Sequence, residues 1–220
     1  MEEEAREDFN VLLSATLTLL GLLIGFTFSM AVGRYDQRKN YEEEEANAIG
    51  TAFVRADLLP NQDATRLRAL LRSYTDQRIL FFNTRDKKEL QQINAETARS
   101  QSELWSTVRA PAASQPTPVV ALVISSINDV LNSQGYTQAA WWNRIPIEAW
   151  AMMVGIAICA NLLAGYGARK AEAQGVLGLV LPLMVSIAFC LIADIDSPRG
   201  GIIRVRPQNL ESLVQSLPST

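Results

Sequence analysis

Three long apolar runs constrain the fold of this 220-residue chain more than any other feature of its sequence. Residues 9–32 carry no charge over 24 positions, and about 20 apolar residues are enough to cross the hydrocarbon core of a bilayer. Residues 145–167 carry one charge, Glu148, close to the start of the run, and residues 176–193 form an uncharged run of 18. Pro182 lies within the last run, where membrane helices tolerate a kink. We therefore predict three transmembrane helices at these positions.

Two other interpretations of the apolar runs are disfavoured. A cleaved signal peptide has a basic leader and a shorter apolar stretch, whereas residues 1–8 contain one basic and five acidic residues. A soluble protein with three buried apolar helices needs enough additional chain to cover them, and 220 residues would struggle to do so. The runs are therefore expected to lie in lipid.

The basic residues near the ends of the runs predict the orientation of the chain. Because three spans alternate in direction, seven of these residues fall on one side of the membrane: Arg34, Arg38, Lys39, Arg144, Arg199, Arg204 and Arg206. Three fall on the opposite side: Arg6, Arg169 and Lys170. Basic residues concentrate on the cytoplasmic side of membrane proteins. We therefore expect residues 33–144 and the C-terminal segment 194–220 in the cytoplasm, and the acidic leader 1–8 outside.

The hydrophilic segment between the first two runs has the pattern of a helical domain. Four helices are predicted there, separated by a turn at residues 58–61 and a breaker segment at 110–116: 35–56, 63–82, 90–108 and 117–135. The first of them continues the first apolar run. Thr117 and Pro118 should open the last helix, and Gly135 should end it. The predicted fold class is an all-α integral membrane protein with three transmembrane helices and a cytoplasmic helical domain.

The composition of the chain speaks against a metal site, a disulfide framework and an enzyme. Histidine is absent, and the two cysteines, Cys159 and Cys190, lie inside apolar runs, where cysteine packs as a small hydrophobe. The sequence contains no nucleophile elbow, glycine-rich phosphate loop or metal-protease motif. A net charge of −3 gives no reason to expect a nucleic-acid partner. We expect neither catalysis nor a cofactor.

A stripe of small residues runs along one face of the first predicted span. Its members follow one another at spacings of four, three, four and four residues: Ser14, Thr18, Gly21, Gly25 and Ser29. Small residues let helix backbones approach closely in lipid. Copies of the same face could also surround a pore, with the hydroxyls and exposed backbone turned to water. Helix packing and pore lining therefore remain alternative interpretations of this small-residue face.

The segment after the third run concentrates charged residues and glycines at the predicted membrane boundary. Together with one residue that follows the first run, its polar members are candidates for a pore mouth or gate: Arg34, Asp194, Asp196, Ser197 and Arg199. Asp194 and Asp196 are also candidate metal ligands, because hard cations prefer oxygen ligands. In the alternative interpretation, Asp196 or Ser197 caps the next helix, or pairs with Arg199 or another neighbouring arginine.

The acidic run at residues 42–45 has two interpretations as well. In an oligomer it could form a ring that attracts cations, and in a monomer it would be a solvated helix face. Arg38 precedes Glu42 by four residues, a spacing that favours an ion pair along the helix.

Five motifs make the chain resemble a known family. They are G-F-T-F-S at residues 25–29, R-Y-D at 34–36, E-A-N-A-I-G-T at 45–51, D-L-L-P at 57–60 and A-D-I-D-S-P-R-G-G at 193–201. Together they resemble the bacterial bestrophin-like membrane family. The resemblance implies distant kinship with bestrophins, which are homo-oligomeric anion channels with a central pore. The acidic calcium ligands of bestrophins have no counterpart in this sequence beyond Asp194 and Asp196.

These observations together predict a homo-oligomer in the bacterial inner membrane. One chain with three spans cannot readily enclose a pore, whereas a ring of copies can, so the expected function is passive ion conduction near the symmetry axis. The arginines near the boundary and the resemblance favour anions, whereas residues 42–45 and the two aspartates favour cations. The expected partners are other copies of the chain, lipid and inorganic ions. The competing hypothesis is a non-conducting scaffold or regulator whose cytoplasmic domain binds a partner.

Overall fold

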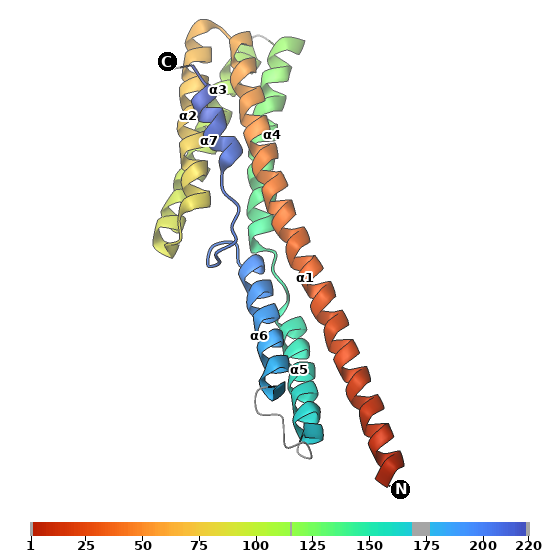
Figure 1. Cartoon of the computed structure of the whole chain (residues 1–220). Coiled ribbons are helices and arrows are strands. Elements are labelled where there is room, and N and C mark those ends of the chain that lie inside the picture. The colour runs from red at the N-terminus through yellow and green to blue at the C-terminus, as the bar shows by residue number, and fades with distance from the viewer. Residues whose placement is uncertain (1, 115, 169–176, 219–220) are drawn as a thin grey trace. The chain divides into compact units, whose positions relative to one another are not determined.

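The computed structural model describes residues 2–114, 116–168 and 177–218, and these residues are almost entirely helical (Figure 1). The elements are α1 (Glu2–Arg55), the short 3-10 helix η1 (Ala56–Leu58), α2 (Asn61–Asn83), α3 (Lys87–Ser114), α4 (Pro118–Trp142), α5 (Ile147–Ala168), α6 (Leu177–Asp196) and α7 (Gln208–Ser216). No strand occurs in the described residues, which confirms the predicted all-helical fold. Several residues used in the predictions lie outside them: Arg169 and Lys170, and parts of predicted segments at residues 1, 115, 176 and 219–220.

The chain divides into two compact units. The first unit consists of residues 1–35 and 144–203, and the second consists of residues 36–143 and 204–220. Helix α1 is continuous over 54 residues and contributes its first part to one unit and its second part to the other. This continuity agrees with the prediction that residues 35–56 extend the first apolar run.

The first unit is built from the first part of α1 together with α5 and α6. Two apolar clusters hold these helices together. In one cluster, Leu20 packs with Val185 and with two alanines of α5, Ala157 and Ala160, whose small side chains permit close helix approach. The second cluster lies at the other end of the unit and contains Ala31, Ile145, Ile192 and Ile195.

Most of the apolar surface of the first unit is nevertheless uncovered. Three helical stretches of the described residues are long and apolar enough to cross a membrane: Ala5–Leu58, Pro118–Gly167 and Gly178–Asp196. In the most apolar part of each stretch, only 11%, 17% and 17% of the residues are buried within the chain. Exposed apolar surface on this scale is unfavourable in water. These helices therefore require lipid, or another copy of the chain, around them.

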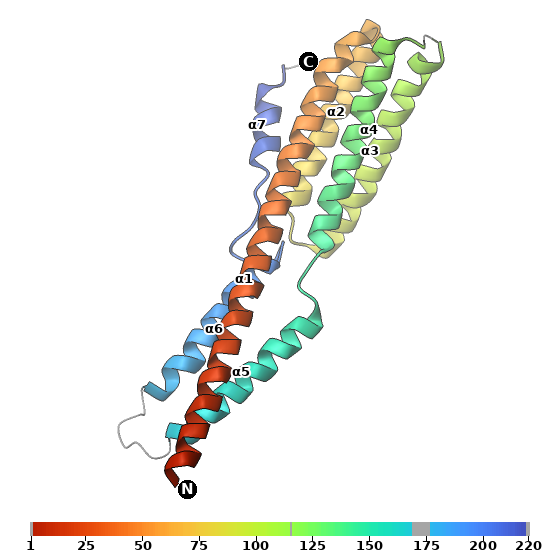
Figure 2. The ribbon, with the colours of Figure 1, turned by 90° about the vertical axis from the view of Figure 1, so that its right-hand side faces the viewer.

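The second unit is a four-helix bundle with a short helix packed beside it (Figure 2). The second part of α1, together with α2, α3 and α4, surrounds a core that includes the fully buried side chains of Ile49, Leu67, Leu71, Tyr74, Phe81, Leu104 and Ile127. Helix α4 begins as predicted, because the Thr117 side chain accepts a hydrogen bond from the Val120 N–H and Pro118 occupies the first turn. The bundle therefore has a buried apolar core, and α4 has a side-chain N-cap.

A buried ion pair crosses this core. Glu45 of α1 accepts hydrogen bonds from Nε of Arg78 on α2 at 2.5 Å and from the Thr137 hydroxyl of α4 at 2.9 Å. The side chains of Glu45 and Arg78 are both 0% exposed. Burial, the largest single influence, lowers the pKa of Arg78, but the charge of Glu45, the interaction with Tyr74 and the hydrogen bond to Glu45 together raise it. Burial, and then the Glu45 charge, raise the pKa of the neighbouring Tyr74. The guanidinium therefore remains charged, and the phenol remains neutral.

The acidic run at residues 42–45 is only partly a solvated face. Glu42 and Glu45 are buried, and only Glu43 and Glu44 are exposed. A three-residue spacing on a helix places Glu42 and Glu45 on the same side of α1, which faces the bundle. Arg38 lies on this side as well and donates hydrogen bonds to the carbonyl oxygens of Ala140 and Asn143, each at 3.2 Å. Charge alone did not reveal which acids of the run would be buried.

Two predicted helix ends are wrong. A breaker segment was predicted to start at residue 110, but helix α3 continues through Pro111 to Ser114. Helix α4 continues through Gly135 to Trp142. A glycine inside a helix costs about 1 kcal/mol, and burial of Val130, Thr137 and Trp141 on the same helix outweighs this cost. Packing in the bundle therefore overrides the local helix-breaking tendency.

Helix α7 was not predicted. It is only nine residues long, and one of its residues, Leu210, is buried. The Glu42 carboxylate accepts hydrogen bonds from the Leu210 N–H at 2.9 Å and from Nδ2 of Asn209 at 2.6 Å, which fixes the start of α7 against α1. Its formation depends on these contacts with distant residues.

We predict that loss of one partner of the buried pair destabilises the second unit. Glu45→Ala leaves the Arg78 charge buried without its partner, so the expected loss is about 3–5 kcal/mol. The apparent midpoint of thermal unfolding in detergent, followed by tryptophan fluorescence, should fall accordingly. Trp141 reports on this region because it packs against Phe81 and Phe82.

Glu44→Ala is the matched control, because Glu44 is exposed on the same helix and its removal should change stability by less than about 0.5 kcal/mol. The double variant Glu45→Leu with Arg78→Met should be more stable than Glu45→Ala, because it leaves no unpaired charge. Equal unfolding midpoints for Glu45→Ala and Glu44→Ala would contradict this interpretation of the pair.

Candidate functional site

The small-residue face of α1 is left uncovered in the part of the chain that the structure describes. All five of its residues are exposed: Ser14, Thr18, Gly21, Gly25 and Ser29. A Cβ atom added to Gly21 or to Gly25 would have no neighbouring atom within 4 Å. The Thr18 hydroxyl donates to the Ser14 carbonyl oxygen of its own helix at 2.8 Å. Packing among the described residues therefore does not account for the two glycines on this face.

A different face of α1 packs against α5 and α6. This face carries the buried side chains of Leu20, Thr27 and Ala31, together with the partly buried Leu17 and Ile24. The Thr27 hydroxyl donates to the Leu23 carbonyl oxygen at 2.7 Å, so its burial leaves no unpaired donor. Contacts within the first unit thus leave the small-residue face available to a second copy or to water.

Exposed polar residues follow at the same helical spacing on the second part of α1. Asp36, Asn40, Glu43 and Asn47 are separated by four, three and four residues, and all four are exposed. Their side chains offer carboxylate and carboxamide oxygens, and no basic residue occurs among them. This row could have been recognised in the sequence, because it continues the period of Gly25 and Ser29.

The predicted pore-mouth residues Arg34 and Asp196 lie together in the first unit. Asp196 ends α6 and is 6% exposed. Its carboxylate accepts hydrogen bonds from the Ile145 N–H at 3.1 and 3.2 Å and from Nη1 of Arg34 at 3.4 Å. One carboxylate therefore joins α1, the chain entering α5 and the end of α6. The alternative prediction that Asp196 pairs with a neighbouring arginine agrees with this geometry.

Asp194 fixes the loop that follows α6. Its two carboxylate oxygens accept hydrogen bonds from the N–H groups of Ile202 and Ile203, at 2.7 and 2.8 Å. Ser197 accepts a hydrogen bond from the Gly200 N–H at 3.1 Å. A Cβ atom at Gly201 would collide with the Asp194 carbonyl oxygen, so only glycine fits this turn.

The hydrogen bonds of Asp194 and Asp196 occupy oxygens that a metal ion would need. The carboxylates of Asp194 and Asp196 both bond to backbone N–H groups. Within the described part of the chain, no three acidic or cysteine side chains gather in a way that could hold a metal ion. Arg199 is half-buried in the same loop. A role for these residues at a pore mouth stays a prediction, and their observed contacts are structural.

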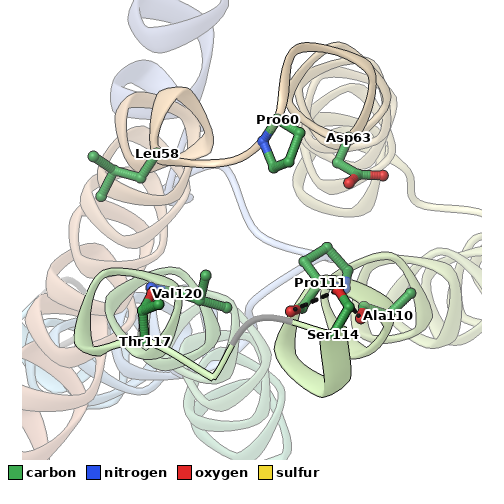
Figure 3. Close-up of a pocket in the computed structure, with 8 residues that line it drawn as sticks. All are labelled: Leu58, Pro60, Asp63, Ala110, Pro111, Ser114, Thr117 and Val120. Atoms are coloured by element: carbon green, nitrogen blue, oxygen red, sulfur yellow. Dashed lines mark hydrogen bonds between the residues drawn. The ribbon is translucent and has the colours of Figure 1, made fainter.

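A pocket of about 330 Å³ lies in the second unit, where η1 and the start of α2 meet the end of α3 and the start of α4 (Figure 3). It is lined by Leu58, Pro60, Asp63, Ala110, Pro111, Ser114, Thr117 and Val120. Asp63 is the one charged side chain among them. The Ser114 hydroxyl donates to the carbonyl oxygen of Ala110. This lining does not bring together groups that would define a particular ligand.

Comparison with known proteins gives a family and a fold. A family model described as a bestrophin-like domain matches residues 4–210. A crystal structure of a bacterial bestrophin homologue from Klebsiella pneumoniae is similar, with a TM-score of 0.71 and 11% identity, covering 94% of this chain and 88% of that chain. A mutant of the bestrophin homologue from the same organism gives a TM-score of 0.72 and 11% identity, covering 93% and 85%. None of the curated proteins matches this chain.

We predict that Asp196→Asn destabilises the first unit. Asparagine retains one acceptor for the Ile145 N–H but loses the charge that Arg34 contacts. Hydrogen bonds to charged groups contribute about 1.5–3 kcal/mol, so the free energy of unfolding should fall by an amount in that range. The fall should appear as a lower thermal unfolding midpoint in detergent. Asp36→Asn removes the same charge from an exposed position and serves as the control. If the two variants unfold at the same temperature, Asp196 does not join the three segments as described.

Proposed function

Because the chain belongs to the bestrophin-like family, we propose that it forms a homo-oligomeric channel for the passive movement of ions across the bacterial inner membrane. The proposed arrangement places the N-terminus outside and the second unit in the cytoplasm. The observation that carries the proposal is the exposed small-residue face of α1, on which an added Cβ at Gly21 or Gly25 has no described atom within 4 Å.

The proposed pore lies between copies of the chain. Among the described residues, the first unit contains three candidate membrane helices, and its apolar clusters fill the contacts between them, so we place the pathway between copies rather than within one. A closed ring of identical copies brings the same face of each α1 toward the symmetry axis. Hydroxyls and exposed backbone on that face provide polar contacts for ions that lose part of their hydration.

The proposed vestibule is formed by the second part of α1. Asp36, Asn40, Glu43 and Asn47 are exposed and follow the period of the small-residue face. Rings of charged side chains around a pore influence which ions enter. In this arrangement α1 alone supplies both the membrane portion of the pathway and its cytoplasmic continuation.

The proposed ion preference is for anions. It rests on the resemblance to bestrophins and on the exposed Arg144, which follows α4 close to the predicted boundary. The contact of Asp196 with Arg34 pairs one acidic charge with one basic charge and so favours neither kind of ion. Asp36 and Glu43 oppose this preference. The sign of the reversal potential of purified protein in a planar bilayer, under a salt gradient, decides between the two.

We predict that Gly25→Leu reduces single-channel conductance several-fold or abolishes it. The added side chain meets no atom of its own chain within 4 Å, so it should obstruct the space between copies. Recordings in planar bilayers measure the effect, and size-exclusion chromatography checks that the variant still assembles.

Gly155→Leu is the matched control. Gly155 is also exposed and has no atom within 4 Å of an added Cβ, but it lies on α5. We expect this variant to conduct like the unmodified protein. Silence of the unmodified protein across ions, pH and voltage, together with a Gly25→Leu change confined to assembly, would instead establish the non-conducting scaffold.

A further inference from the structure

The loop that follows α6 presents an isoleucine to its surroundings. Ile202 is 91% exposed, the highest value among the large apolar side chains of the described residues, and the adjacent Ile203 is 38% exposed. Exposure of an isoleucine to water is unfavourable. The fixed exposure of Ile202 therefore suggests that another apolar group or molecule covers this side chain.

The position of Ile202 is fixed by the last turn of α6. Asp194 lies in that turn, and its carboxylate accepts hydrogen bonds from the N–H groups of Ile202 and Ile203 at 2.7 and 2.8 Å. Gly201 packs so closely against Asp194 that a Cβ atom would collide with it. The Asp194 side chain thus ties the backbone of Ile202 directly to the end of α6, a helix that is long and apolar enough to span a membrane.

The surroundings of this loop combine apolar and basic groups. The hydrogen bonds from the Ile145 N–H to Asp196 place the entry to α5 beside the end of α6. Ile147, in the first turn of α5, is 74% exposed, and Arg144 is exposed just before it. Apolar side chains beside arginine suit the boundary between acyl chains and anionic headgroups.

We propose that the loop held by Asp194 is a lipid anchor, in which Ile202 inserts among the acyl chains at the membrane boundary and Arg144 faces lipid phosphates. Lipid is favoured over a second copy of the chain because the loop continues the apolar surface of α5 and α6, and because the neighbouring basic charge complements anionic headgroups. The proposal rests on α6 crossing the membrane, which is part of the proposed function, and it is independent of ion conduction.

Spin labelling tests the anchor directly. Both native cysteines are replaced by alanine, and a nitroxide is attached at Ile202→Cys in full-length protein in vesicles of phosphatidylethanolamine and phosphatidylglycerol. Collision rates with oxygen, which concentrates in lipid, and with a water-soluble nickel complex are then compared. Leu183→Cys, 61% exposed in the middle of α6, serves as the lipid reference. Glu103→Cys, exposed on α3, serves as the water reference.

We expect the ratio of oxygen to nickel collisions at residue 202 to exceed that at residue 103 several-fold and to approach that at residue 183. A ratio equal to the water reference would overturn the anchor. Protection from both reagents would overturn it as well, because it would show that protein covers the loop. If the label at residue 183 also collides mainly with nickel, the proposed membrane placement itself fails.

A second variant tests the role of Asp194. Asp194→Ala removes the acceptor of the Ile202 and Ile203 N–H groups, so the label at residue 202 should shift toward the water reference. The label at residue 183, placed in the same Asp194→Ala background, should remain in lipid and so report that α6 is intact. An unchanged ratio at residue 202 would show that Asp194 does not hold the loop at the boundary.

Discussion

The uncovered apolar surface of α1, α5 and α6 is the constraint on which the rest of the structure depends. Water cannot solvate this surface favourably, and the helices bury little of it against one another. In lipid, every backbone polar group must be satisfied within the helix itself, which accounts for long uninterrupted spans. Just before α5 and just after α6 the chain is not helical. There the carboxylates of Asp196 and Asp194 accept hydrogen bonds from backbone N–H groups. These two acids therefore satisfy backbone donors next to the apolar helices.

The second unit differs from the first in that its core includes a buried pair of charges. Glu45 and Arg78 are buried together, and Arg38 donates to carbonyl oxygens at the end of α4. A buried pair contributes little net stability compared with apolar packing, but an unpaired member is costly. The pair thus penalises any arrangement in which α1 is rotated or shifted against α2. Such a penalty fixes which face of α1 remains exposed, and that exposed face carries the row beginning at Asp36.

Sequence reasoning identified features that depend on local pattern. The apolar runs, the continuous first helix and the Thr117–Pro118 helix start all follow from spacing or capping within a few residues. It failed where distant contacts decide the outcome. Gly135 continues its helix because the bundle buries the residues around it, and α7 forms against Glu42, more than 160 positions away in the chain. For the site, the small residues of α1 were found by their period, whereas the joint role of Arg34, Ile145 and Asp196 requires the fold.

The central claim is that copies of α1 surround an ion pathway with their small-residue faces inward. An electron cryomicroscopy reconstruction of the detergent-solubilised particle tests it most directly, because it shows the symmetry and the side chains along the axis together. We predict a closed ring with a central opening faced by Ser14, Thr18, Gly21, Gly25 and Ser29. A particle without a central opening, or one in which this face of α1 is turned to detergent, would contradict it.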